Sequence, residues 1–204
     1  MTARRFHRPT LFGPLAMDTR PGGADPAERH EAAYATARVL VLRGREEGRH
    51  PEALQRLVEL ADSDGLEVLA ELWSDAPADS LPGALWRVYL LRSWVRADPR
   101  RAATEFDEGR RSTPVLEAVA GVAEPPGPDQ VLALADAVLH GVYDGDFAIA
   151  LQRAAAFARV VAVGRARTGP EELPDTLSAA RLVRLAENLE AAAASWRTGD
   201  LQVQ

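Results

Sequence analysis

The stretch FAIALQRAAAFARVVAV, residues 147 to 163, decides the fold that the sequence predicts. Alanine is the best helix former, and small side chains occupy most of the circumference of the helix that this stretch would form. Neighbouring helices can approach such a surface closely. We therefore expect a central helix here, with other helices packed around it.

Apolar residues repeat at spacings of three and four through most of the chain after Asp25, which predicts amphipathic helices. No short window shows the alternation of β-branched residues that a strand needs. The sequence therefore predicts an all-α fold, a bundle of about nine helices arranged as helix hairpins without a sheet. The expected helices begin near residues 25, 51, 66, 81, 99, 112, 129, 146 and 175.

Capping residues support several of these starts. Asp25, Ser80 and Asp98 each precede a proline within two residues, as at many helix N-termini. The last helix has the most regular period and covers about two heptads, which favours packing inside the bundle over a dimer zipper. Its apolar positions are Leu182, Leu185, Leu189, Ala192 and Trp196.

Residues 25–198 are expected to form one all-helical domain, with a subdomain break at 124–129, EPPGPD, as the alternative. Residues 1–24 are rich in proline and glycine, which predicts an extended or disordered N-terminal arm. Residues 199–204 are expected to form a short tail. An extended arm would lie across a groove on its own chain or on a neighbour. The apolar residues that such an arm would offer are Phe6, Leu11 and Phe12.

Composition removes several kinds of chemistry. The chain has no cysteine, which excludes disulfides, thiol nucleophiles and cysteine-based metal sites. It has no lysine either, so a Schiff base or a P-loop lysine is excluded. The motifs GxSxG, GxGxxG and HExxH are absent. We predict no catalytic residue, cofactor or metal site, and lean against an enzyme.

The net charge of -6 argues against nucleic-acid binding, because phosphate contacts require a basic surface. Only 1–24 and 86–111 are mildly basic. No apolar run approaches the about 20 residues of a membrane span, and the N-terminus lacks the long apolar stretch of an export signal. A soluble cytoplasmic protein is expected.

The segment DAVLHGVYDGDFAIA, residues 136 to 150, raises the question of a metal site. Asp136, His140 and Asp144 are four residues apart, which predicts one solvated polar stripe along a helix. Gly145 would then be the left-handed cap of that helix and Asp146 the N-cap of the next. A metal site would need further ligands from another helix, so we favour a helix hairpin.

An aromatic group follows successive turns of the helix expected at 81–97. Such a stripe is typical of core packing but could also line a ligand pocket or a protein interface. Nearby arginines could hold phosphate or an acidic peptide, although interleaved acids indicate a solvated, ion-paired surface. The candidate interaction residues here are Trp86, Tyr89, Trp94, Arg100 and Arg101.

Three segments resemble a set of uncharacterised actinobacterial proteins of about this length: LWRVYLLRSWVRADP, GVYDGDFAIALQRAAAFARVV and LVRLAENLEAAAASW. The resemblance covers about residues 80–198 and implies a helical architecture without an assigned activity. Bacterial regulators with an N-terminal helix-turn-helix also have about nine helices at this length. Here the corresponding stretch is an acidic helix pair without the usual Thr- and Gly-rich turn, so we do not adopt that interpretation.

The leading hypothesis is a non-catalytic cytoplasmic protein that acts through contacts with a protein partner or with a second copy of itself. The alternative is a helical small-molecule-binding protein or enzyme that uses the face between Trp86 and Trp94. A third hypothesis is nucleic-acid binding through the arginine-rich segments.

Overall fold

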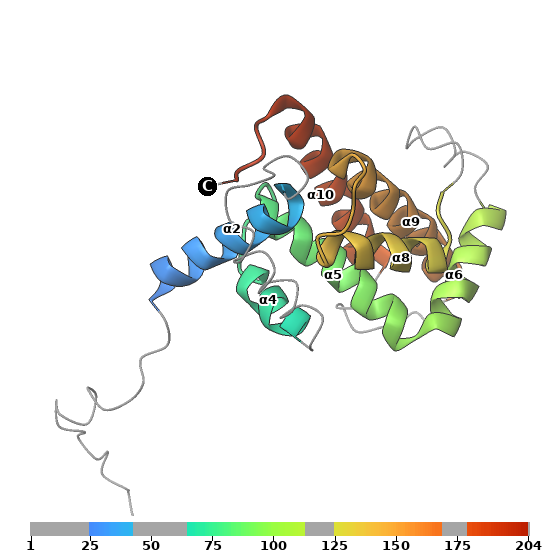
Figure 1. Ribbon diagram of the computed structural model, residues 1–204. Coiled ribbons are helices and arrows are strands. Elements are labelled where there is room, and N and C mark those ends of the chain that lie inside the picture. Colours follow the sequence, from blue (N-terminus) through green and yellow to red (C-terminus); the bar gives the residue numbers. More distant parts are fainter. Residues whose placement is uncertain (1–24, 43–64, 113–124, 169–178, 204) are drawn as a thin grey trace, which may run out of the picture.

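The computed structural model describes residues 25–42, 65–112, 125–168 and 179–203. These ranges contain helices and no strand, which confirms the predicted all-α class (Figure 1). The seven helices are α2 (Pro26–Leu42), α4 (Leu66–Trp73), α5 (Leu81–Ala97), α6 (Pro99–Ser112), α8 (Pro128–Leu139), α9 (Phe147–Thr168) and α10 (Ala179–Thr198). The count of nine is not confirmed, because the helices expected at 51–61 and beyond Ser112 lie outside the described residues.

The helix α9 is the centre of the fold, as the sequence predicts. It packs against α10, α6, α8 and α5 (Figure 1), and all of its alanines except Ala166 are buried, with its phenylalanines and most of its valines. By length and composition α9 could cross a membrane, contrary to the expectation from sequence. However, 72% of its most apolar window is buried under neighbouring helices, as in the core of a soluble protein.

The contact between α9 and α10 combines an apolar seam with an ion pair. Leu182 and Leu189 of α10 are buried, so the predicted packing inside the bundle is confirmed. Beside this seam, the Arg159 guanidinium donates two hydrogen bonds of 2.6 Å to the Glu190 carboxylate. These bonds are the main cause of the raised pKa of Arg159.

The helix α5 packs against every other helix that the structure describes. Its N-terminus is fixed by Ser80, whose buried hydroxyl accepts a hydrogen bond from the Gly83 amide at 3.2 Å. The predicted caps at Asp25 and Asp98 are confirmed in the same way, with carboxylate oxygens 3.0 and 3.1 Å from backbone amides. These three helix starts could therefore be predicted from the local sequence.

The segment 199–203 folds back onto the start of α5. A Schellman turn ends α10, with Gly199 at a φ of +79° and the Asp200 amide 2.8 Å from the Ser195 carbonyl. The Leu81 amide then donates to the Gln202 carbonyl at 2.9 Å, and Ser80 and Gln202 form an isolated parallel β-bridge. The expected tail is thus held against α5 by backbone hydrogen bonds.

The turn between α8 and α9 differs from the prediction. The helix α8 ends at Leu139, and the left-handed residue is Gly141, with φ +65°, instead of Gly145. The Val142 amide bonds to the Ala137 carbonyl at 2.9 Å and closes a Schellman turn. Asp144 therefore lies outside the helix, so the predicted stripe of three residues does not exist. The predicted N-cap at Asp146 is confirmed by a bond of 2.8 Å from the Ala148 amide.

Candidate functional site

A buried ion pair joins α6 to α9. The side chains of Glu105 and Arg165 are each 3% exposed, and an Arg165 Nη2 to Glu105 Oε2 distance of 2.8 Å connects them. Arg101, four residues before Glu105, approaches the other carboxylate oxygen at 2.7 Å. The Arg165 guanidinium also lies 4.6 Å from the centre of the Trp94 ring. The charges of this cluster are paired with one another.

This cluster accounts for two of the sequence candidates. Arg101 is a partner of Glu105, and Trp94 lies beneath Arg165 with its ring 6.4 Å from that of Phe157. Arg100 directly precedes Arg101 in α6 and is exposed. Trp94 lies about 80° around α5 from Trp86, at the edge of the expected aromatic face, and packs toward α9.

Trp86 and Tyr89 form a stacked pair on α5. At about 100° per residue, Trp86 lies about 180° around the helix from Val95, which is buried. The Trp86 and Tyr89 rings stack with centroids 5.5 Å apart, and neighbouring Leu90 is 39% exposed. We call Trp86, Tyr89 and Leu90, with Arg87 and Arg96 beside them, the outer face of α5.

The outer face of α5 carries positive charge from Arg87 and Arg96. The helix α5 contains no aspartate or glutamate. Arg87 is half-buried and donates to the Gly83 carbonyl at 2.6 Å, and burial lowers its pKa. Arg96 is exposed at the last turn. Within the described ranges neither arginine forms a salt bridge, so both remain able to pair with a carboxylate from outside.

Asp136 has a partner that the sequence did not reveal. Its carboxylate accepts a hydrogen bond from Nε of Arg92, a residue of α5 whose side chain is 8% exposed. The His140 ring nitrogen Nδ1 lies 2.7 Å from the Asp136 backbone carbonyl. The Asp136 side chain is 39% exposed, as expected of a solvated residue, but it is not idle, because it neutralises a nearly buried cation.

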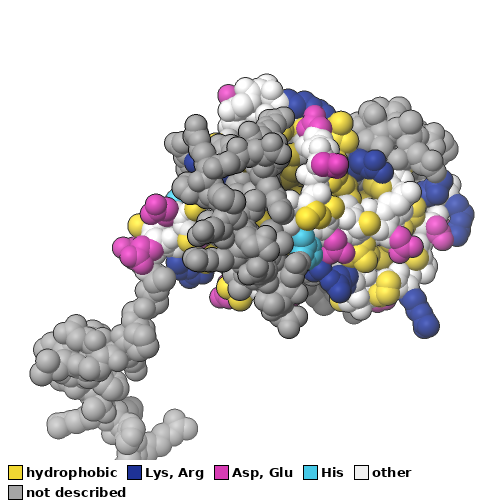
Figure 2. All heavy atoms as spheres, viewed as in Figure 1, with side chains coloured by type: hydrophobic (Ala, Val, Ile, Leu, Met, Phe, Trp, Pro, Cys, Tyr) yellow, Lys and Arg dark blue, Asp and Glu magenta, His cyan; other side chains and the backbone are white. Residues whose placement is uncertain are grey.

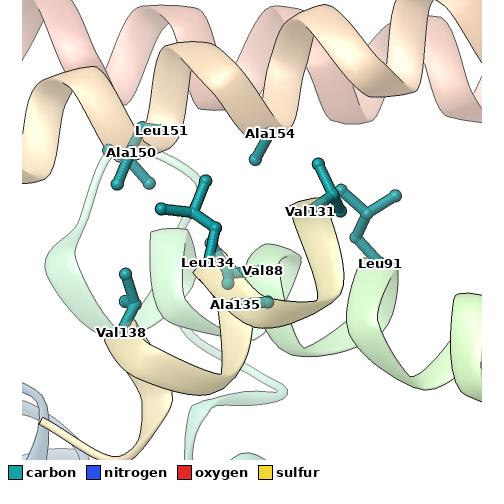
Figure 3. Close-up of a pocket in the computed structure, with 9 residues that line it drawn as sticks. All are labelled: Val88, Leu91, Val131, Leu134, Ala135, Val138, Ala150, Leu151 and Ala154. Carbon is teal, nitrogen blue, oxygen red and sulfur yellow. The ribbon is translucent and has the colours of Figure 1, made fainter. Parts of the chain in front are cut away.

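A small cavity lies between α5, α8 and α9 (Figure 3). Its volume of about 10 Å³ is the size of one water molecule, and its walls are entirely aliphatic, so it should be empty. Val88 and Leu91 line it from the side of α5 that faces away from Trp86. The other lining residues are Val131, Leu134, Ala135, Val138, Ala150, Leu151 and Ala154. This cavity therefore offers no room to a metabolite.

The connection between α8 and α9 exposes apolar side chains next to carboxylates. Val142 is 62% exposed and Ile149 is 45% exposed, while Asp144 and Asp146 are exposed between them in sequence. Tyr143 is half-buried at this turn. Its pKa is raised mainly by burial, and Asp146 and Asp144 raise it further against an opposing effect of Arg153. We call Val142 to Asp146 together with Ile149 the α8–α9 corner.

Sequence reasoning missed this corner because it extended the preceding helix to about residue 143, with Val142 on its apolar face and Asp144 on its polar stripe. The helix ends earlier, at Leu139, so Val142 and Tyr143 follow the left-handed Gly141, beyond the core-facing period of the helix. Two large apolar residues beyond a helix end have no guaranteed place in the core.

Acidic and basic side chains alternate on the side of the molecule that Figure 2 shows, without a patch of one sign over its coloured part. On α6, Arg111 and Glu108 are 3.0 Å apart, and Arg167 of α9 also approaches Glu108, at 3.2 Å. This pairing fits the solvated, ion-paired surface expected from sequence. No group of three or more histidine or acidic residues suited to a metal occurs within the described ranges.

The apolar arm residues Phe6, Leu11 and Phe12 lie outside the described residues. Comparison of the chain with protein-family models, curated proteins and solved structures gives no match. The resemblance to actinobacterial proteins therefore stays a prediction, and any functional proposal depends on the surfaces described above.

Proposed function

We propose that this is a non-catalytic cytoplasmic protein that binds another protein through the outer face of α5. The observation that carries this proposal is the position of Trp86, Tyr89 and Leu90, which lie opposite the buried side of α5 and between two arginines. Tryptophan, tyrosine and arginine are the residues most enriched at the energetic centre of protein interfaces. An exposed aliphatic side chain beside stacked aromatic rings adds apolar area that a partner would remove from water.

The hydrogen bonding of the aromatic pair supports the same proposal. Neither the Trp86 indole N–H nor the Tyr89 hydroxyl has a hydrogen-bond partner in the described part of the chain. By contrast, the buried indole of Trp73 donates to the Thr36 hydroxyl at 3.1 Å. Polar groups on partly exposed aromatic rings are satisfied by water or by a partner, which is why such rings suit interfaces.

The ion pairs between helices argue against catalysis. Glu105 and Arg165 neutralise each other, and Asp136 neutralises Arg92. A catalytic acid or base must be accessible to substrate and hold a proton at the working pH. These groups instead serve as ion pairs between helices, which supports a binding role.

The small-molecule alternative receives less support from the geometry. It requires Trp86 and Trp94 to face a common pocket, whereas Trp86 stacks on Tyr89 and Trp94 lies against Arg165. A ligand site for a metabolite normally encloses several hundred Å³, far more than the cavity between α5, α8 and α9.

The test is photo-crosslinking in living cells of the source organism. A photoreactive amino acid replaces Leu90 in the full-length protein, and the matched control replaces Ala194, which is exposed on α10. We expect a discrete crosslinked protein from position 90 that is absent from position 194 and is lost when Arg96→Glu is added. Identical products from both positions, or none from position 90, would contradict the proposal. A thermal shift of several degrees with a metabolite would instead favour the small-molecule alternative.

A further inference from the structure

We propose that the outer face of α5 binds the α8–α9 corner of a second copy of this chain. This inference rests on the proposed function, because it names the partner of the same face. It makes the protein a self-associating one, in which each copy supplies one surface of each kind.

The exposed apolar residues support this pairing. Within the described ranges the large hydrophobic residues with substantial exposure are Val68, Leu90, Val142 and Ile149. Leu90 belongs to the outer face of α5, and Val142 and Ile149 belong to the α8–α9 corner. Each surface thus offers aliphatic area that the other could cover, and half-buried aromatic rings adjoin both, Trp86 and Tyr89 on one and Tyr143 on the other.

The charges of the two surfaces are complementary. The outer face of α5 offers Arg87 and Arg96 without a carboxylate on that helix, and the corner offers the exposed Asp144 and Asp146. Arg153 lies near the corner but is outnumbered there by the two aspartates. Complementary charges around apolar centres are typical of protein interfaces, where they select the partner and the register.

The two surfaces cannot meet within one copy. The helices α8 and α9 enclose the small cavity together with Val88 and Leu91, so they lie on the inner side of α5. The outer face points away from that side. Contact must therefore join different copies head to tail, which builds a ring or an open chain of copies.

The N-terminal arm is a poorer occupant of the outer face. Its sequence, residues 1–24, contains Arg4, Arg5, Arg8 and Arg20 against a single acid, Asp18. Such a segment would place arginine against Arg87 and Arg96. The corner of a second copy brings carboxylates instead.

Charge reversal in the full-length protein tests the pairing by sedimentation velocity over about 1 to 100 µM, the range of weak protein association. The variants are Arg96→Glu on the outer face and Asp144→Arg on the corner, both at exposed positions. Matched controls are Arg184→Glu on α10 and Asp107→Arg on α6, which are also exposed. Circular dichroism verifies that every variant keeps the helical content of the wild type.

We expect the wild type and both controls to sediment faster as concentration rises, and each of the two test variants alone to remain a monomer. An equimolar mixture of Arg96→Glu and Asp144→Arg should associate again, because the first keeps an intact corner and the second an intact outer face. A wild type that stays monomeric throughout, or association that survives either test variant, would overturn the inference. A monomeric wild type together with a foreign protein crosslinked at position 90 would leave the proposed function standing and remove only the self-association.

Discussion

The backbones of Gly109 on α6 and Gly164 on α9 meet with no space for a side chain. A Cβ built on Gly164 would lie 1.7 Å from the Glu105 carbonyl oxygen and 2.9 Å from the Gly109 nitrogen. A Cβ built on Gly109 would lie 2.0 Å from the Val160 carbonyl oxygen. Because the obstructing atoms are backbone atoms, only a shift of a whole helix could relieve the overlap.

Replacing Gly164 with alanine should therefore lower the free energy of unfolding by at least about 2 kcal/mol, through the overpacking of a rigid contact. Chemical denaturation monitored by circular dichroism measures this loss. The matched control is Gly127→Ala, whose Cβ would make an ordinary contact of 3.8 Å with Phe106 and should cost less than about 1 kcal/mol. Equal losses at the two positions would show that α6 and α9 are not in this close contact.

The adjoining ion pair gives a second prediction. Glu105→Ala leaves the Arg165 guanidinium buried without its carboxylate, so stability should fall by about 3 to 5 kcal/mol. The double variant Glu105→Leu with Arg165→Met replaces the pair by apolar side chains and should recover much of that loss. Denaturation of the two variants compares them directly. A double variant as unstable as Glu105→Ala would contradict the assignment of the loss to an uncompensated charge.

Asp136 and Asp144 should differ sharply, although the sequence suggests one stripe for both. Asp136→Ala removes the acceptor of the nearly buried Arg92 and should cost about 1 to 3 kcal/mol. Asp144→Ala changes an exposed residue and should stay within about 0.5 kcal/mol of the wild type. Thermal or chemical denaturation of the two variants measures both losses of stability. Equal small losses would support the original prediction that both carboxylates are solvated and without a structural role.

The raised pKa of Tyr143 predicts an alkaline effect on stability. The folded protein holds this proton more tightly than the unfolded chain, whose tyrosine pKa is near 10.0. The stabilising contribution of Tyr143 is therefore complete below pH 10 and is lost as the pH rises through the folded pKa. Unfolding measured above pH 10 should show a shallower decline for Tyr143→Phe than for the wild type.

Tyrosinate absorbance checks the same pKa directly. The chain has three tyrosines and no lysine or cysteine, so few other side chains titrate in this range. The difference between the titrations of wild type and Tyr143→Phe should be a single transition above pH 10. A midpoint at or below 10 would contradict the burial of this ring.

Features that depend on neighbouring residues in the chain could be predicted from sequence. Ser80, Asp98 and Asp146 cap helices within three residues of themselves, and the alanines of α9 predicted a central helix. The position of Gly141 was harder to predict, because Gly145 also follows an apolar helical stretch. Only the Schellman hydrogen bonds show which glycine adopts the left-handed conformation.

Features that depend on distant residues could not be predicted. Arg92 and Asp136 are 44 residues apart, and Glu105 and Arg165 are 60 apart, so nothing in the local pattern joins them. The same holds for the candidate surfaces. The sequence identified Trp86, Tyr89 and Trp94 together, but only the structure shows that Trp94 contacts Phe157 and Arg165 whereas Trp86 stacks on Tyr89.

The bridge between Ser80 and Gln202 has a consequence for folding during synthesis. It joins positions more than a hundred residues apart, so the contact order of this part of the fold is high. Although α5 packs against every other described helix, its first turn obtains these backbone bonds only after residue 202 has left the ribosome. We therefore expect α5 to form early, because it is synthesised before most of the helices that pack on it. Its first turn should nevertheless be among the last parts of the chain to gain full protection from hydrogen exchange, because the bonds to Gln202 form late.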